Sequence, residues 1–328
     1  MNILVTGGMG FIGSNYIDYL LNNFPDFKIT NIDALFYGSN INNIKNSQKI
    51  KNYKFVHGNI TDNELMKKLI SKNDIIINFA AESFVDRSIS NAKPFLESNI
   101  NGVFTILEIL KTDNKKFIHI STDEVYGSLL NGSADEDFNY NPSSPYSSTK
   151  ASAELLINSY VKTYGCDCLI TRCTNNFGPR QFPEKLIPKV IFLASFNKNI
   201  PVYGNGKNLR DWLYVEDHCS AITSVLLNGK SGQSYNISSN NELDNIFVIK
   251  KILSLMDKSF DLITFVDDRP GHDLRYAMNS SKIRNELNWQ PLTSFDDGIK
   301  NTIDWYLSNK TWWDSIENTI HNHSPWKN

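Results

Sequence analysis

The most constraining feature of this sequence is a group of three glycines near its beginning. The stretch TGGMGFIGS places Gly7, Gly10 and Gly13 between a strand predicted over Asn2–Thr6 and a helix predicted over Gly10–Asn23. Gly7 and Gly10 allow a tight turn and the close approach of a pyrophosphate to backbone N–H groups, and Gly13 lets the helix press on the strand. The spacing is a variant of the dinucleotide-binding fingerprint.

An aspartate at the end of the next predicted strand strengthens this interpretation. Lys28–Asp33 is typical of a strand, and Asp33 comes 20 residues after Gly13. A carboxylate in that place accepts hydrogen bonds from the adenosine ribose and repels a 2′-phosphate, and no arginine stands beside it, so NAD is favoured over NADP. The alternative is a glycine-rich turn followed by a solvated aspartate.

Strand and helix patterns alternate through the first half of the chain. Further strands are predicted over Tyr53–His57, Asp74–Ala80, Lys115–Ser121 and Cys168–Cys173, and helices over Asp62–Ser71, Pro94–Leu110 and Ser147–Tyr164. This alternation predicts an α/β fold with a doubly wound, Rossmann-type parallel sheet. After about residue 175 the pattern loosens into segments rich in Pro and Gly. We therefore assign 1–175 to an NAD-binding domain, to which some later segments return, and 176–328 mainly to a smaller lobe at the ligand-binding carboxyl edge of the sheet.

Composition excludes several other classes of protein. The chain has 328 residues and a formal net charge of −2 without a long block of like charge, which argues against binding to nucleic acid or to a membrane surface. With no signal peptide and no apolar run of about 18 residues, we expect a cytoplasmic protein. Cys166, Cys168, Cys173 and Cys219 lack zinc-like spacing, so we expect reduced structural thiols and no metal site.

The strand predicted over Lys115–Ser121 ends in polar side chains where a turn of Gly, Asn or Pro is usual. It delivers Thr122, Asp123 and Glu124 in succession. A hydroxyl and two carboxyls at the end of a buried strand are candidates for catalysis, and the alternative is a solvated turn or a helix cap.

A tyrosine and a lysine further along the chain form a second candidate pair. Tyr146 and Lys150 are four residues apart and share one face of a helix. A lysine one turn from a tyrosine favours the phenolate and can also reach a nicotinamide ribose, which makes Tyr146 a candidate base. The alternative is a pair of surface side chains.

Together these motifs resemble the extended short-chain dehydrogenase/reductase superfamily and, within it, the dTDP-glucose 4,6-dehydratases. The resemblance runs from residue 1 to about residue 310 and rests on TGGMGFIGS, NIDALFYGSN, NFAAESFVDRSI, ISTDEVYG, PYSSTKA, NNFGPRQFPEKLIP, PVYGNGKNLRDWLYVEDH and DRPGHDLRY. The Thr-Asp-Glu triplet is its most specific part, because nucleotide-sugar epimerases of the superfamily typically carry small hydroxyl residues there.

The resemblance implies a reaction and a role for each candidate residue. Tyr146 takes the proton of the 4-hydroxyl of dTDP-glucose while C4 gives hydride to NAD⁺, and Thr122 hydrogen-bonds that oxygen. Glu124 then removes the C5 proton, Asp123 protonates the departing 6-hydroxyl, and hydride returns to C6, which gives dTDP-4-keto-6-deoxyglucose. The two carboxyls need different protonation states and therefore different environments. Lys150 completes the catalytic set.

The resemblance also implies contacts with both ligands. NAD contacts are expected at Gly7, Gly10, Phe11, Ile12, Gly13, Asp33, Ala34, Leu35, Phe36, Asn59, Ile60, Ala80, Ala81, Ser83, Ser98, Tyr146, Lys150 and Asn176. Substrate contacts are expected at Phe84, Thr122, Asn175, Lys185, Leu186, Pro201, Val202, Tyr203, Arg210, Asn236, Arg269 and His272. The arginines suit the diphosphate, because guanidinium groups pair with phosphate oxygens.

Two residues depart from the family's pattern. The family usually has aspartate where Asn59 stands, so we expect modestly weaker cofactor binding, since an amide oxygen can still accept from the adenine amino group. The family usually has histidine where Phe84 stands, and phenylalanine cannot donate a hydrogen bond. That substitution leaves the preferred sugar or nucleotide open.

Three alternatives stay open. The first is UDP-glucose as the substrate, because these motifs do not distinguish it from dTDP-glucose. A nucleotide-sugar epimerase or decarboxylase would share the cofactor site and the Tyr/Lys pair, although not the adjacent Asp123 and Glu124. A non-catalytic NAD-binding module would have no reason to keep the whole catalytic set.

A homodimer is expected through the helices that begin near Pro94 and Ser147. Both helices carry apolar residues on more than one face, which indicates a second partner. These residues are Phe95, Ile100, Phe104, Leu107 and Leu110 in the first helix and Leu155, Leu156 and Tyr160 in the second. The resemblance implies the same four-helix interface.

Overall fold

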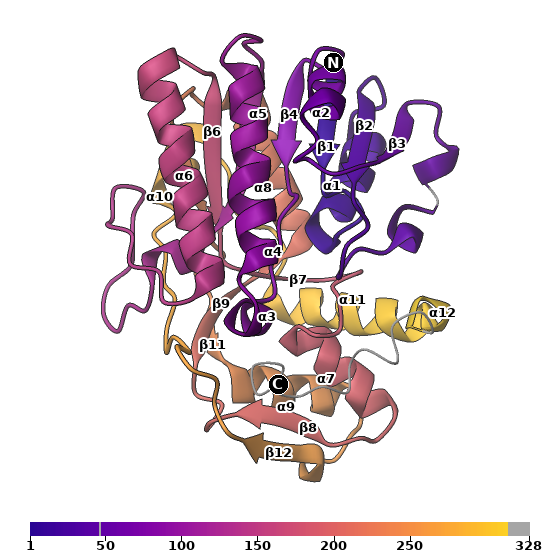
Figure 1. Cartoon of the computed structure of the whole chain (residues 1–328). Helices are drawn as coiled ribbons and strands as arrows, with labels where there is room; N and C mark the ends of the chain where they lie inside the picture. The colour runs from indigo at the N-terminus through magenta and orange to yellow at the C-terminus, as the bar shows by residue number, and fades with distance from the viewer. Residues whose placement is uncertain (46, 314–328) are drawn as a thin grey trace.

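A seven-stranded parallel sheet forms the centre of the computed structural model, which describes residues 1–45 and 47–313 (Figure 1). The strand order is β10-β6-β5-β4-β1-β2-β3, and every neighbouring pair is parallel. The strands are β1 (Asn2–Thr6), β2 (Lys28–Asp33), β3 (Tyr53–His57), β4 (Ile75–Asn78), β5 (Lys116–Thr122), β6 (Cys168–Cys173) and β10 (Ser234–Ile237). The predicted Rossmann-type sheet is confirmed.

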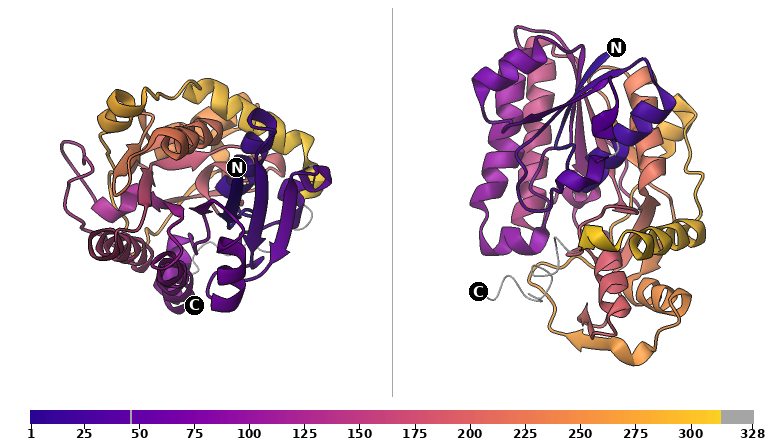
Figure 2. Two further views of the ribbon diagram at one scale, coloured as in Figure 1. Left: turned by 90° about the horizontal axis from the view of Figure 1, so that it is seen from above. Right: turned by 90° about the vertical axis from the view of Figure 1, so that its right-hand side faces the viewer.

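Helices cover both faces of this sheet (Figure 2). On one face lie α2 (Asn63–Ile70), α5 (Gly102–Leu110) and α6 (Pro145–Tyr164); on the other lie α1 (Phe11–Asn23) and α8 (Val215–Asn228). The side chains of β1 alternate between two cores, because Leu4 packs under α2 and α5, and Ile3 and Val5 pack under α1 and α8. With both faces buried, the strands are apolar almost throughout.

Two helices differ from the prediction in ways that local chemistry explains. The helix predicted from Ser147 begins at Pro145, because Ser144 caps it in a capping box with Ser147. The helix predicted over Pro94–Leu110 is divided into α4 (Lys93–Phe95), a π-helical stretch over Leu96–Asn101, and α5. Asn99 lies in that stretch and is buried, with its amide bonded to Glu82 O and to Thr149 Oγ1.

The second half of the chain builds a smaller lobe below the carboxyl edge of the sheet and also returns to the sheet (Figure 1). Its strands are β7 (Asn175–Phe177), β9 (Leu209–Tyr214) and β11 (Glu242–Asp244) in one sheet, and β8 (Ile200–Tyr203) and β12 (Ile263–Val266) in another. Its helices are α7 (Leu186–Ser195), α9 (Asn245–Leu255), α11 (Phe295–Ser308) and α12 (Lys310–Trp313). Strand β10, helix α8 and α10 (Ser281–Leu287) pack with the first half. Residues 314–328 of the predicted lobe lie outside the described residues.

No helix in the described part of the chain has the length and hydropathy needed to cross a membrane.

Candidate active site

The glycine turn between β1 and α1 has no room for side chains. Gly7 has φ +71°, and a Cβ built on it lies 2.5 Å from the backbone N of Ala80. A Cβ built on Gly13 lies 2.5 Å from the Gly7 carbonyl oxygen. Helix α1 has Gly10 as its N-cap and no side-chain cap, so the first N–H groups of the helix are left to bind an anion.

Asp33, at the end of β2, is hydrogen-bonded to the glycine turn. Its carboxylate accepts hydrogen bonds from Met9 N at 2.9 Å, Leu35 N at 2.8 Å and Ser39 Oγ at 3.1 Å. Burial raises its pKa, and the two backbone donors act in the opposite direction. Leu35 has φ +55° and does not line the cavity described next, so its part is to shape the turn.

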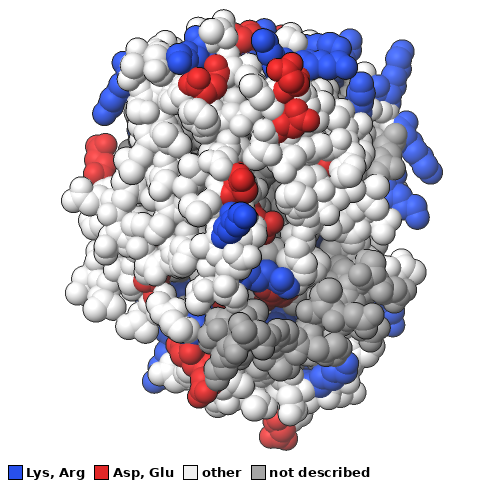
Figure 3. Space-filling model, in the orientation of Figure 1, with Lys and Arg blue, Asp and Glu red and all other residues white. Residues whose placement is uncertain are grey.

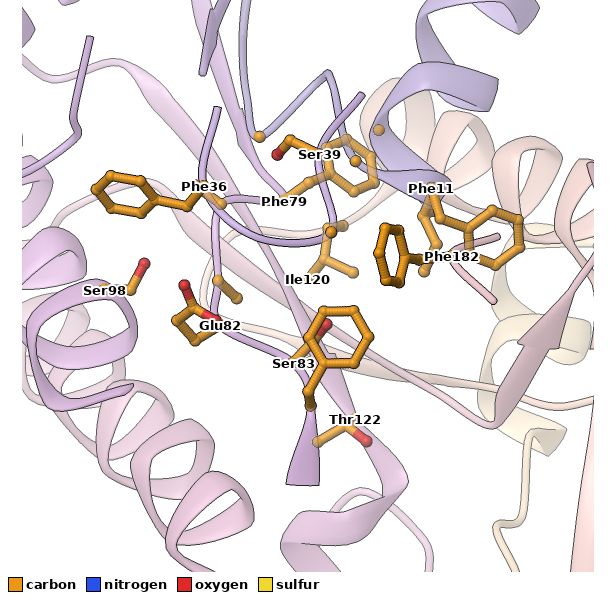
Figure 4. A pocket seen from close by; sticks show the side chains of 18 of the residues that line it. Phe11, Phe36, Ser39, Phe79, Glu82, Ser83, Ser98, Ile120, Thr122 and Phe182 are labelled. Carbon is orange, nitrogen blue, oxygen red and sulfur yellow. The ribbon is translucent and has the colours of Figure 1, made fainter. Parts of the chain in front are cut away.

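A single cavity runs from the glycine turn to the end of β5. Of the residues expected to contact NAD, all but Leu35 line it. The expected substrate residues Phe84, Thr122, Asn175 and Lys185 line it too, together with Asp123 and Glu124. In Figure 4, Phe36 and Ser98 lie on one side, Phe11 and Phe182 on the other, and Thr122 at the far end.

Five buried polar atoms along this cavity have no hydrogen-bond partner within the described residues. They are Asp123 Oδ2, Thr174 Oγ1, Asn175 Oδ1, Asn176 Oδ1 and Gln181 Oε1. Buried polar groups are nearly always paired in folded proteins. These atoms, the glycine turn and the carboxylate of Asp33 therefore fit a polar dinucleotide such as NAD.

Strand β5 ends at Thr122, and a 3₁₀ turn over Asp123–Tyr126 follows it directly. Asp123 and Glu124 are the first two residues of this turn. The Thr122 hydroxyl caps this turn by accepting from Glu124 N at 3.3 Å and donates to Asp123 Oδ1 at 3.1 Å. Burial, and then the neighbouring charge of Glu124, raises the pKa of Asp123 to about 8. The carboxyl of Asp123 is therefore protonated at neutral pH and can act as an acid.

Glu124 has a different environment from its neighbour. Burial raises its pKa, but the positive charges of Arg269, Lys185 and Arg210 lower it. The hydroxyl of Tyr276 lies 3.5 Å from Glu124 Oε2. The three positive charges favour the carboxylate form of Glu124, which suits a base.

Tyr146 and Lys150 both line the cavity from α6. Lys150 Nζ donates to Ile120 O at 2.7 Å and lies 3.2 Å from His119 Nε2. The pKa of Tyr146 is raised well above its ordinary value by burial and by the charge of Glu124. Burial therefore disfavours the phenolate in the ligand-free protein, and the predicted effect of Lys150 on the phenol stays a prediction.

The other expected substrate residues lie outside the cavity lining, and all but Asn236 lie in the lobe. Arg210 donates to Asp273 O at 2.9 Å, and Arg269 pairs with Asp86 at 2.5 Å. Tyr203 donates to Asp86 Oδ2 at 3.1 Å. His272, Leu186, Pro201 and Val202 complete this group, although the side chain of Val202 is buried in the lobe core.

Asn236 is the one expected substrate residue whose side chain is fully committed elsewhere. It has no exposed surface. Its amide accepts from Tyr126 at 2.9 Å and donates to Ala134 O and Asn279 O. In the ligand-free protein these bonds hold the Asn236 side chain beside the central sheet, to which its strand β10 belongs, and its contact with substrate stays a prediction.

The structure shows the contacts of the two residues that depart from the family pattern, Asn59 and Phe84. Asn59 Oδ1 accepts from Thr61 N at 3.0 Å, which fixes the orientation of the amide. The ring of Phe84 packs edge-on against Tyr37 and Phe182, with Lys185 Nζ 5.0 Å from its centre. Phe84 therefore belongs to an aromatic wall of the cavity.

Sequence reasoning missed a group that joins the first domain to the segment before α7. Tyr37 donates to Glu184 at 2.5 Å, Arg87 pairs with Glu184 at 3.1 Å, and the Arg87 guanidinium lies 3.4 Å from the centre of the Tyr37 ring. It also missed Thr174, Gln181 and Phe182 in the cavity lining. All of these stand within or beside the motifs quoted above, and that proximity was the available signal.

Among residues 1–45 and 47–313, no group of three or more His, Cys, Asp or Glu side chains is arranged to hold a metal ion. The four cysteines are buried and free.

Comparison with known proteins gives matches along nearly the whole chain. The family model described as GDP-mannose 4,6 dehydratase matches residues 4–302. The low-salt glycan biosynthesis protein Agl12 of Haloferax volcanii is 49% identical, with 94% of this chain and 99% of that protein covered. The dTDP-glucose 4,6-dehydratase of Escherichia coli is 44% identical, with 96% of each chain covered. The crystal structure of the Bacillus anthracis dTDP-glucose 4,6-dehydratase in complex with NAD has a TM-score of 0.91 and 46% identity, covering 96% of this chain and 99% of that one.

Proposed function

The chain belongs to the GDP-mannose 4,6 dehydratase family, and we propose that it is an NAD-dependent hydro-lyase that converts dTDP-glucose to dTDP-4-keto-6-deoxyglucose. One observation carries this proposal beyond the family. Asp123 and Glu124 are neighbours at one cavity, yet burial holds the first protonated while three cations favour the charged form of the second. Elimination of water needs an acid and a base at once.

The residues present can hold NAD, which supplies a hydride acceptor for C4 and a hydride donor for C6. The glycine turn and the start of α1 bind the pyrophosphate, and Asp33 binds the adenosine ribose. Lys150 reaches the nicotinamide ribose from α6. The unpaired amide oxygens of Asn175 and Asn176 face the same cavity.

The protein's own groups move the protons. Tyr146 accepts the proton of the 4-hydroxyl as a phenolate, after its own phenol proton has passed to solvent, and Thr122 holds that oxygen. The 4-ketone makes the C5 proton acidic, so Glu124 can remove it. Asp123 then gives its proton to the departing 6-hydroxyl, which leaves as water.

The lobe supplies the binding site for the nucleotide part of the substrate on this proposal. Residues 176–328 mainly form this lobe, and 1–175 mainly form the NAD-binding domain. Arg210 and Arg269 bind the diphosphate, because both guanidinium groups retain N–H donors beyond those used in the ligand-free protein. Leu186, the 201–203 segment and His272 contact the substrate from the same lobe on this proposal.

A homodimer in the cytoplasm completes the proposal. Phe104 on α5 and Leu155 on α6 are 46% and 55% exposed, while Phe95, Leu107 and Leu110 are buried in the core. Figure 3 shows few charged side chains on the surface over α5 and α6. A helical surface with few charges and with exposed apolar side chains suits a second copy of the same helices.

The test is incubation with dTDP-glucose and, separately, UDP-glucose. A 4-keto product, read by its absorbance in alkali, should form many times per enzyme on stoichiometric NAD⁺, without free NADH accumulating. Faster turnover of UDP-glucose would replace the nucleotide assignment. Release of NADH in proportion to substrate would mark a simple dehydrogenase and defeat the proposal.

A further inference from the structure

A buried ion pair lies next to the turn that carries the two candidate acids. It joins Glu154 of α6 to Arg172 of β6, which are 0% and 2% exposed. Arg172 donates to Glu154 Oε2 through Nε at 2.8 Å and through Nη2 at 2.6 Å. Neither residue lines the cavity, and the proposed reaction uses neither. Apolar side chains in place of a buried ion pair often stabilise a protein equally well, so stability alone does not account for this pair.

The ion pair is tied to the chain on both sides of the two acids. Ser121 of β5, two residues before Asp123, donates to Glu154 Oε1 at 2.5 Å. Tyr126 is the last residue of the 3₁₀ turn, and its hydroxyl accepts from Arg172 Nη1 at 2.5 Å. The end of β5 and the end of the turn are therefore bound to one buried group.

The chemistry of the partners fixes how the Tyr126 hydroxyl is bound. A guanidinium can only donate, so the oxygen of Tyr126 accepts from Arg172 and its hydrogen goes to Asn236 Oδ1 at 2.9 Å. The amide of Asn236 cannot be turned over, because its nitrogen donates to the carbonyl oxygens of Ala134 and Asn279. Burial raises the pKa of Tyr126, so the hydroxyl keeps its hydrogen.

The two acids have few hydrogen bonds of their own. Within the described residues, the carboxyl of Asp123 receives one hydrogen bond, from the Thr122 hydroxyl at 3.1 Å, and its Oδ2 has no partner. The partner of Glu124 Oε2 is the Tyr276 hydroxyl at 3.5 Å, which is long for a hydrogen bond. The places of both carboxyls therefore depend on the backbone of the turn.

The residues assigned to the oxidation of C4 are held in another way. Thr122 pairs with Cys173 in the ladder between β5 and β6. Tyr146 and Lys150 lie on α6, a helix of 20 residues. A change at the end of the turn should therefore reach Asp123 and Glu124 without displacing these residues.

We propose that Glu154 and Arg172, acting through Tyr126, hold the turn in the place where Asp123 and Glu124 can eliminate water. This rests on the proposed dehydratase function. Glu154, Arg172 and Tyr126 are positioning residues, because none of them lines the cavity. A displacement of about 1 Å can cost a catalytic group about a hundredfold in rate, so the loss should be confined to the step that uses the two acids.

The chain offers a matched pair of variants. Tyr126→Phe removes the hydroxyl at the end of the turn. Tyr140→Phe removes a hydroxyl bound to the same ion pair, since Tyr140 accepts from Arg172 Nη2 at 2.9 Å and donates to Glu154 Oε2 at 3.0 Å, but Tyr140 lies outside β5 and the turn. Arg172 Nη1 keeps its bond to Glu136 O at 3.0 Å in both variants, so the guanidinium stays paired.

The first test is a single turnover of dTDP-glucose in deuterated water with stoichiometric NAD⁺. In Tyr126→Phe, NADH should form within about twofold of the wild-type rate, while solvent deuterium enters C5 roughly tenfold more slowly. In Tyr140→Phe both rates should stay within about twofold of wild type. The proposal is overturned if Tyr126→Phe slows both steps equally or neither, or if Tyr140→Phe slows the exchange as much as Tyr126→Phe does.

The second test does not need catalysis. Amide hydrogen exchange of the peptide 121–127, followed by mass spectrometry, should be roughly tenfold faster in Tyr126→Phe than in wild type or in Tyr140→Phe. Unchanged exchange in Tyr126→Phe, or a wild-type peptide that already exchanges as an open loop, would overturn the proposal even in an active dehydratase. Conversely, the expected exchange in a protein inactive on nucleotide sugars would defeat the dehydratase function and not the role of the ion pair in holding the turn.

Discussion

The hydroxyl of Thr122 donates to Oδ1 of Asp123 at 3.1 Å, while Oδ2 of that carboxyl has no hydrogen-bond partner among the described residues. A buried, unpaired oxygen disfavours the charged form of the carboxyl. The same oxygen lines the cavity, where a proton on it can be given to a ligand. The environment of the Asp123 carboxyl therefore differs from that of Glu124, although the two residues are adjacent in sequence.

Substituting each carboxyl should therefore stop the reaction at a different step. Glu124→Gln should still oxidise C4, so NADH should appear in a single turnover, while solvent deuterium enters C5 at least about a hundredfold more slowly, in keeping with the usual size of a general-base contribution. Asp123→Asn should leave C5 exchange comparatively intact and slow the loss of the 6-hydroxyl. Equal loss of exchange in both variants would show that the assigned roles are wrong.

The protonated state of Asp123 should also cost stability as the pH rises. The pKa of this carboxyl is about 8 in the folded protein against an ordinary value of 3.8. Between these values the folded protein binds more protons than the unfolded chain, so stability falls with rising pH. The Tm of Asp123→Asn minus that of wild type should therefore grow from pH 5 to pH 8 and then level off.

Calorimetry of the exposed Asp137→Asn variant provides the matched control, and its Tm should stay parallel to that of wild type. Parallel curves for Asp123→Asn as well would contradict the buried, protonated carboxyl.

The first half of the fold follows from local sequence, whereas the lobe depends on long-range pairing. Strands β1, β2, β3 and β6 have the predicted bounds, since each is a short apolar run between turn residues. Pairing of β10 with β6 joins segments more than 60 residues apart in sequence, and no local pattern specifies it. The sequence therefore did not show that Asn236 lies on a strand of the central sheet.

In the candidate site, too, the sequence predicts the parts set by local motifs and not those set by long-range packing. Motifs brought the glycine turn, Asp33 and the acids together correctly in space, because each stands at the carboxyl end of a parallel strand. The contact of Lys150 with His119 could not be predicted, since it depends on how α6 packs against β5.

Asn59 should weaken the binding of NAD by a measurable amount. Its amide oxygen is already bound to Thr61 N, whereas a carboxylate would offer a second oxygen to the adenine amino group. We expect Asn59→Asp to lower the Kd for NAD by roughly two- to tenfold, the range of one hydrogen bond. Calorimetric titration measures it, with Asn63→Asp as a control that adds the same charge outside the cavity. An equal or weaker affinity of Asn59→Asp would refute this reading.

The proposed dimer interface predicts which exposed apolar side chains the dimer needs. Leu155→Asp and Phe104→Asp should each shift the protein from dimer to monomer in sedimentation velocity at micromolar concentration, because each buries a charge in the interface. Leu130 is 66% exposed and belongs to neither α5 nor α6, so Leu130→Asp should leave the dimer intact. A monomeric wild type, or a monomeric Leu130→Asp alone, would contradict the interface.

The most direct test of the whole account follows the hydride itself. With dTDP-glucose carrying deuterium at C4 and NAD⁺ in stoichiometric amount, the deuterium should be recovered at C6 of the 4-keto-6-deoxy product, with solvent hydrogen at C5. Mixing this substrate with unlabelled dTDP-glucose should not scramble the label while the cofactor stays bound. Deuterium that stays at C4, or that accumulates in free NADH, would contradict an internal transfer from C4 to C6 and with it the assigned function.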